Sequence, residues 1–220
     1  MPRVDAADSE IDLYTWTTPN GRKVSIMLEE LGVPYAVHPI DIGAGAQFAP
    51  DYLAISPNNR IPAIVDRRTG FSLMESGAIL LYLAESYGRF LPTDADRRWR
   101  AVEWLMWQMG GAGPMLGQAH HFLKYNPGKS QYAEERYAAE AKRLYGVLDR
   151  RLDGHEFVAD EYSVADIAIW PWISRFEWQQ IDLADFPNVR RWYGAIAARP
   201  AVQRGYDQPH FANPIPVVAP

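Results

Sequence analysis

The chain has 220 residues, of which 48% are hydrophobic and 22% are charged, so it has the composition of a globular protein with one large or two small domains. Its formal net charge of −5 argues against general binding to the phosphate backbone of nucleic acids. Because it contains no cysteine, disulfide bonds, thiolate metal sites and a protein-borne cysteine nucleophile are excluded. Any thiol chemistry therefore requires a ligand that supplies the thiol.

The chain carries no pattern of a targeting or membrane segment. Residues 1–10 are polar and acidic, which is unlike a secretory signal. No apolar run approaches the length of a membrane span. We therefore expect a soluble cytoplasmic protein without a membrane partner.

Residues 11–90 mix strand and helix patterns. Alternating, β-branched or aromatic runs predict strands, and helical spacing closed by glycine predicts helices. The expected strands are 11–16, 35–41, a short one at the end of 58–66, and 73–74, and the expected helices are 24–31, 50–55 and 78–85. This order is a βαβ unit followed by ββα, which predicts a thioredoxin-like domain with a mixed sheet.

The segment 58–66 predicts a tight turn that feeds a short strand. Pro62 has no amide donor, so it should begin the strand or lie at the sheet edge. The Ile61–Pro62 bond is a candidate for the cis form, which would leave the Ile61 backbone open to an extended peptide.

Glu75-Ser76-Gly77 opens the helix that follows. A helix start collects unpaired N–H groups and a partial positive charge, which suits a carboxylate. The Ser76 hydroxyl is a further donor, and Glu75 suits an ammonium group. The motif predicts a site for a small peptide with an amino-acid head; the alternative is a simple helix cap.

From Arg97 onward the chain shows only helical spacing. The aromatic residues of 99–122 suggest core and interface packing, and its glycines with Pro114 predict a kink. Further helices are expected at 132–152, 167–178 and 188–198, the last being the final clear helix. Ser163 with Asp166 predicts a capping box, and the proline-rich tail 208–220 is expected to pack on the body.

His120-His121 does not predict a metal site, because adjacent helical residues do not face each other. No phosphate-binding loop or hydrolase elbow is present in the sequence.

Four segments, taken in order, carry a resemblance to a known family: Pro19-Asn20-Gly21, Ser56-Pro57-Asn58-Asn59-Arg60-Ile61-Pro62-Ala63, Glu75-Ser76-Gly77-Ala78-Ile79 and Ser163-Val164-Ala165-Asp166. They resemble the cytosolic glutathione transferases over nearly the whole chain. More narrowly, segments 18–21, 45–48 and 110–118 resemble the bacterial Nu class, which is also similar to a yeast nitrogen regulator of the same fold. The resemblance implies a glutathione-binding thioredoxin-like domain at 11–90, an all-helical domain at 96–207 and a tail at 208–220.

The resemblance implies glutathione as co-substrate, with no metal. Ser76 and the helix start would hold its γ-glutamyl carboxylate, and Glu75 its ammonium. The Ile61 backbone would pair with the cysteinyl residue, as a strand edge does. Gln47 would reach the glycyl carboxylate, where Arg60 either adds charge or is a surface residue.

Arg136 matches an arginine that reaches the partner subunit's site in related Nu-class proteins. This implies a homodimer. Without that role, Arg136 is an ordinary surface ion-pair residue.

The reacting group is a thiolate, and a free thiol of pKa about 8.5 is only slightly ionised at neutral pH. The resemblance assigns thiolate stabilisation to Thr18 and Asn20, both of which can donate hydrogen bonds. Thr17 is an alternative. Tyr14 looks like a strand residue, although a nearby tyrosine is catalytic in other classes.

The Nu class is associated with glutathione-dependent disulfide reduction, which is the function the resemblance implies here, with glutathione and oxidised glutathione as ligands. The first alternative is a conjugating transferase or a peroxidase for organic hydroperoxides. The second is a non-catalytic, glutathione-binding regulatory protein.

Overall fold

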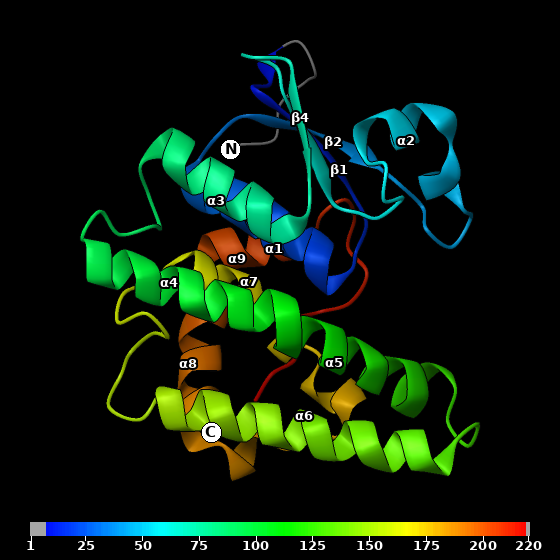
Figure 1. The fold of residues 1–220 in the computed structure, drawn as a ribbon, viewed down its shortest axis with the longest axis vertical. Helices are drawn as coiled ribbons and strands as arrows, with labels where there is room; N and C mark the ends of the chain where they lie inside the picture. Colours follow the sequence, from blue (N-terminus) through cyan, green and yellow to red (C-terminus); the bar gives the residue numbers. More distant parts are fainter. Residues whose placement is uncertain (1–7, 219–220) are drawn as a thin grey trace. The chain divides into compact units, whose positions relative to one another are not determined.

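The computed structural model describes residues 8–218 (Figure 1). Packing divides the chain into two units. The first comprises the residues up to Leu91 together with Ala198–Ile215, and the second comprises Pro92–Ala197 and the residues from Pro216 onward.

The first unit is built on a four-stranded mixed sheet of order β2-β1-β3-β4. Its strands are β1 Ile11–Thr15, β2 Tyr35–Pro39, β3 Ala63–Asp66 and β4 Phe71–Met74. β1 runs parallel to β2 and antiparallel to β3, and β3 is antiparallel to β4. The expected thioredoxin-like plan is confirmed, and Pro62 directly precedes β3 after a cis Ile61–Pro62 bond.

The helices of the first unit before Leu91 are α1 Pro19–Leu31, α2 Pro50–Ile55 and α3 Ser76–Tyr87, with a short 3₁₀ turn at Ala46–Phe48. The prediction that the first helix starts at residue 24 was wrong. Thr18 caps α1 by accepting a hydrogen bond from the Gly21 N–H at 3.1 Å, and Pro19 occupies the first helical position, where no amide donor is needed.

In the described part of the second unit, all regular elements are helices, joined by loops, apart from an isolated bridge between Ala159 and Glu161. Its α-helices are α4 Ala95–Trp107, α5 Gly113–Ala119, α6 Gln131–Arg151, α7 Val164–Ile173 and α8 Pro187–Ala197. The predicted kink between α4 and α5 takes the form of a π-helical stretch at Gln108–Ala112, a known way of bending a helix. None of the helices within residues 8–218 is long and apolar enough to cross a membrane.

The aromatic residues of α4 are only partly in the core. Trp99 is 68% exposed and the neighbouring Met106 is 48% exposed, so neither is in the core of this chain, and interface packing of these two stays a prediction. The cause of their exposure is their position on the helix face opposite the buried Ala101 and Leu105.

The start of α7 carries the predicted capping box of Ser163 and Asp166. The Asp166 carboxylate also accepts hydrogen bonds from the Val158 N–H at 3.1 Å and from the Trp192 indole at 2.8 Å. The capping box thus fixes α7 against α8 as well as capping the start of the helix.

The last helix was missed by the sequence analysis. α9, Pro200–Tyr206, follows α8 because Pro200 stops one helix and opens the next at its first position. α9 packs on α1 (Figure 1), where the Ser25 hydroxyl donates to the Gly205 carbonyl at 2.6 Å. The division at 96–207 and 208–220 therefore stays a proposal, since packing attaches α9 and most of the tail to the first unit.

The tail lies on its neighbours, as expected. Asn213 accepts a hydrogen bond from the Arg22 guanidinium at 3.2 Å, and the His210 ring lies edge-on to Trp16 at 4.9 Å. Residues 219–220 lie outside the described part of the chain.

Gly205→Ala should destabilise the first unit. A Cβ there would lie 2.6 Å from the Ile26 Cα and 2.7 Å from the Ile26 amide nitrogen, so α9 would have to move off α1. Overpacking of this kind costs about 1–3 kcal/mol of unfolding free energy. The measurement is urea unfolding, monitored by tryptophan fluorescence and by circular dichroism.

Gly194→Ala is the matched control. Gly194 lies within α8, and an added Cβ would meet nothing within 4 Å. The Gly194→Ala variant should therefore be more stable by up to about 1 kcal/mol of unfolding free energy, because alanine favours the helix more than glycine does. Equal effects of the two substitutions would contradict the packing of α9 on α1.

Candidate functional site

Strand register brings the candidate residues of the first unit to one end of the sheet. Thr15, the last residue of β1, is opposite Pro39, the last residue of β2. Ala63, the first residue of β3, is paired with Met74, the last residue of β4. Tyr14 pairs with Ala63, so all four strands share this end.

The segments that leave or enter this end contain every candidate of the first unit. They are the β1–α1 turn with Thr18 and Asn20, the segment after β2 with Gln47, the segment before β3 with Ile61, and the β4–α3 junction with Glu75 and Ser76. The sheet topology therefore brings these candidate residues to one end of the sheet, although they are far apart along the chain.

The β1–α1 turn is tight. The Thr18 N–H donates to the Trp16 carbonyl at 2.7 Å, and Asn20 lies in the first turn of α1. A Cβ at position 21 would collide with the Trp16 carbonyl, which explains the glycine. The Thr18 hydroxyl accepts from the Gly21 N–H, so its own hydrogen can be donated elsewhere, next to the positive end of α1.

The β4–α3 junction holds Glu75 in an unusual backbone conformation. Its φ is +70°, a region that non-glycine residues rarely adopt and that concentrates at functional sites. Its exposed carboxylate accepts a hydrogen bond from the Asn58 amide at 3.4 Å. Ser76, the first residue of α3, is buried, being only 3% exposed.

A lysine that the sequence analysis missed lies beneath this junction. Lys23 is 1% exposed, and its ammonium donates to the Ser76 hydroxyl oxygen at 3.2 Å. Burial lowers the pKa of Lys23 to about 7, although the charge of Glu75 acts in the opposite direction. The available signal was its spacing from Ile26 and Met27, which places a lysine on the apolar stripe of α1.

Gln47 offers a polar group that is open to a ligand, and Ile61 follows a fixed carbonyl at the entry to β3. Gln47 is buried, and its amide oxygen has no hydrogen-bond partner within the described residues. Such orphaned buried groups are uncommon and often mark a place where a ligand completes the hydrogen bonds. The carbonyl of the preceding Arg60 is held by the Tyr52 hydroxyl at 2.6 Å and the Ser56 hydroxyl at 2.9 Å, which positions the strand entry at Ile61.

Tyr14 is a strand residue, as its sequence position suggested. Its ring stacks on His38 with centroids 4.6 Å apart, and burial raises the pKa of Tyr14. A raised pKa opposes a tyrosinate role. Thr17 is half-buried in the turn before the Thr18 cap.

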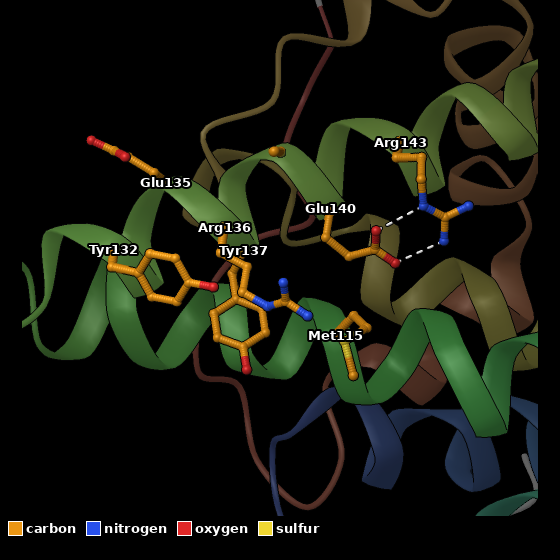
Figure 2. A pocket seen from close by; sticks show the side chains of 8 residues that line it. Met115, Tyr132, Glu135, Arg136, Tyr137, Glu140 and Arg143 are labelled. Atoms are coloured by element: carbon orange, nitrogen blue, oxygen red, sulfur yellow. Dashed lines mark hydrogen bonds and ion pairs between the residues drawn. The ribbon is translucent and has the colours of Figure 1, made fainter.

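Arg136 belongs to the second unit, on α6. It is exposed and lines a pocket of about 600 Å³ between α5 and α6 (Figure 2). The pocket also contains Met115, Tyr132 and Tyr137, with the Glu140–Arg143 ion pair at one side. The arrangement presents a cation among aromatic rings on an open face.

No group of three or more His, Cys, Asp or Glu within residues 8–218 is arranged to hold a metal ion. His120 is buried between Trp172 and Trp178 and hydrogen-bonded to Gln179 at 3.0 Å. Burial lowers the pKa of His120 to about 4, so it is a neutral packing residue at physiological pH.

Family models match both units. The model of the glutathione S-transferase N-terminal domain matches residues 9–85, and that of the C-terminal domain matches residues 113–200. Among curated relatives, the disulfide-bond oxidoreductase YfcG of Escherichia coli is 50% identical over 87% of this chain and 92% of its own. The disulfide-bond oxidoreductase YghU of the same organism is 44% identical over 89% and 73%.

Solved structures of glutathione transferases superpose closely on this chain. A glutathione transferase from Burkholderia graminis with two bound glutathione molecules per subunit superposes with a TM-score of 0.87, at 45% identity over 93% of this chain and 90% of the other. One from Pseudomonas putida with a bound glutathione disulfide gives 0.88, at 43% identity over 94% of each chain. The resemblance seen in the sequence motifs is confirmed, and the chain belongs to the glutathione S-transferase family.

Proposed function

We propose that this protein is a glutathione-dependent disulfide-bond reductase. The observation that carries the proposal is a site of the glutathione transferase type in a chain without cysteine. Its relatives YfcG and YghU are disulfide-bond oxidoreductases, and neighbouring structures hold two glutathione molecules or a glutathione disulfide.

The reaction needs no covalent bond to the protein. A glutathione thiolate attacks one sulfur of the substrate disulfide, forming a mixed disulfide and releasing one substrate thiolate, which takes a proton. A second glutathione thiolate attacks the glutathione sulfur of the mixed disulfide and releases the other substrate thiol. Two glutathione molecules are thereby oxidised to one glutathione disulfide, and the substrate disulfide is reduced to two thiols.

Thr18 and Asn20 are proposed to stabilise the attacking thiolate. The Thr18 hydroxyl can donate while it caps α1, and Asn20 lies one residue after Pro19 in the same helix turn. Donors near a helix start lower a thiol pKa, and each pKa unit is worth about 1.4 kcal/mol. Thr17 is kept as the alternative to Thr18.

Ser76, Glu75, Ile61 and Gln47 are proposed to bind glutathione along its length. The buried Ser76 hydroxyl and the α3 start suit the γ-glutamyl carboxylate, and the exposed Glu75 carboxylate suits the ammonium. Ile61 precedes β3 and can extend its ladder to the cysteinyl backbone. The orphaned Gln47 amide suits the glycyl end.

A second glutathione transferase subunit is proposed as the partner of the pocket on α5 and α6. Arg136 is exposed there, and Tyr132 on α6 and Trp99 on α4 are large exposed apolar side chains of the same unit. Exposed apolar groups rimmed by charges are typical of interaction surfaces. We further propose a cytoplasmic location, where glutathione is kept reduced.

Disulfide reduction should exceed aromatic conjugation in catalytic efficiency, because the turn after β1 offers Thr and Asn to the sulfur and no Ser, Tyr or Cys. The measurement is steady-state reduction of 2-hydroxyethyl disulfide beside conjugation of a chlorinated dinitrobenzene and reduction of an organic hydroperoxide. Conjugation or peroxidase activity without disulfide reduction would contradict the proposal. Glutathione binding without any activity would favour the regulatory alternative.

Ser76→Ala should weaken glutathione binding, and Asn20→Ala should mainly slow turnover. Loss of a hydrogen bond to a charged group costs about 1.5–3 kcal/mol of binding free energy. Loss of a donor to the thiolate should raise the pKa of the bound thiol instead. Calorimetry and thiolate absorbance separate the two effects.

Ser72→Ala is the matched control, because Ser72 is an exposed serine on β4. An unchanged thiol pKa in Asn20→Ala would move that role to Thr18 or Thr17. Unchanged affinity in Ser76→Ala would show that the ligand is placed wrongly.

The protein should be a dimer, with a mass by light scattering of twice the 25.0 kDa chain.

If Arg136 acts in the partner's site, an Arg136→Ala subunit and an Asn20→Ala subunit should complement each other when mixed. The mixed dimer then contains one site with both residues intact. A monomer, or a mixed dimer without recovered activity, would refute the role of Arg136.

A further inference from the structure

The tail places a histidine against the turn that holds the proposed thiolate donors. His210 lies edge-on to Trp16, with ring centroids 4.9 Å apart, and the Trp16 carbonyl accepts the Thr18 N–H at 2.7 Å. Both rings belong to the first unit. The pair of rings therefore borders the β1–α1 turn that supplies Thr18 and Asn20.

The tail is anchored on both sides of His210. Pro209, directly before it, is buried. The tail then passes the start of α1 (Figure 1), where Asn213 accepts a hydrogen bond from the Arg22 guanidinium at 3.2 Å. The His210 ring is nevertheless exposed, and it has no hydrogen-bond partner within residues 8–218. A histidine of defined position thus offers its ring nitrogens to a ligand.

The proposed reaction needs a proton donor that stands away from the attacking thiolate. Each exchange step forms one S–S bond and breaks another, and the electron pair of the broken bond leaves on a substrate sulfur. The leaving sulfur lies beyond the attacking sulfur by two S–S bond lengths, about 4 Å. A proton donor beside the attacking thiolate would quench it, so the acid has to come from a segment other than the thiolate donors.

We propose that His210 is the general acid that protonates the leaving thiolate. Its imidazolium gives one proton to the departing substrate sulfur as the S–S bond breaks, and the neutral imidazole regains a proton from water. A histidine ring ordinarily takes up and releases a proton near neutral pH, which a general acid requires. The role rests on the proposed disulfide reduction and adds to it a catalytic residue from the tail.

Other titratable groups at this end of the sheet are less suited to the task. The His38 ring nitrogen is bound to Asp12 at 2.7 Å. Burial raises the pKa of Tyr14, which makes its hydroxyl a poorer acid. The Lys23 ammonium is buried and donates to the Ser76 hydroxyl oxygen.

The charged groups of the elements that adjoin the tail form no ion pair with His210. Asp207, directly before the tail, is exposed. Arg22 of α1 binds Asn213, and Arg204 of α9 is paired with Glu29 at 2.7 Å. Within the described part of the chain, Trp16 is the neighbour of the His210 ring.

The test compares two disulfides of similar size whose leaving groups differ in basicity. Diethyl disulfide releases a strongly basic thiolate, whereas bis(2,2,2-trifluoroethyl) disulfide releases a weakly basic one, because fluorine withdraws electrons. A less basic thiolate leaves faster without help, so an acid matters most for diethyl disulfide. Reduction by glutathione is followed by coupling the oxidised glutathione to glutathione reductase and NADPH.

His210→Phe keeps an aromatic ring for Trp16 but cannot give a proton. Its kcat/KM should fall about a hundredfold for diethyl disulfide and change little for the fluorinated disulfide. Added imidazole should restore the reduction of diethyl disulfide by His210→Ala, because the position is exposed. His155→Phe is the matched control: His155 belongs to the second unit, where it is paired with Asp160 at 2.6 Å, and the variant should behave as the wild type.

Calorimetry with S-methylglutathione should give the same affinity for His210→Phe and for the wild type, since this ligand has no leaving group. An equal loss for both disulfides, no loss for either, or no rescue by imidazole would overturn the acid role of His210 while leaving the proposed function in place. A wild-type protein that binds S-methylglutathione but reduces neither disulfide would refute the proposed function, and the role of His210 with it.

Discussion

The packing of the first unit depends on α1, a helix that is buried together with its charged side chains. Every residue of this helix from Gly21 to Glu30 is buried, including two cations and two carboxylates. Burying a charge without a partner costs several kcal/mol, so each must be matched. Glu29 is matched by Arg204 of α9 at 2.7 Å and Glu30 by Arg199, directly before α9, at 2.6 Å, and the Arg22 guanidinium lies 3.4 Å from the centre of the Tyr206 ring. The sheet, α3 and α9 are therefore held by the same helix that presents the reacting end of the site.

The motifs that could be predicted from the sequence are local ones. Pro62 before a strand, Glu75-Ser76 before a helix and the Ser163 cap each depend on a few neighbouring residues, and the structure has all three elements. The mixed sheet also followed from the βαβ-ββα sequence of patterns, although its strand order did not. These features required no knowledge of distant contacts.

The features that were missed depend on contacts between distant segments. α9 is a seven-residue helix that gains its stability from α1, and its own sequence is too short to predict it. Lys23 lies just outside the helix predicted at 24–31, and its contact with Ser76, 53 positions later, depends on how α1 and α3 pack. The exposure of Trp99 likewise depends on which face of α4 the second unit covers, which composition does not reveal.

The attachment of α9 and the tail to the first unit has a consequence for synthesis of the chain. Arg199, Arg204 and Asn213 leave the ribosome long after their partners on α1, because more than 160 residues separate each pair. Domains generally fold as they emerge, N-terminal part first. While the helical unit is still being translated, Glu29, Glu30 and Arg22 would not yet have their partners from residues 199–213. The nascent first unit therefore stays incomplete until residues 199–213 have been translated, and its packing around α1 is finished only after the helical unit between them has been made.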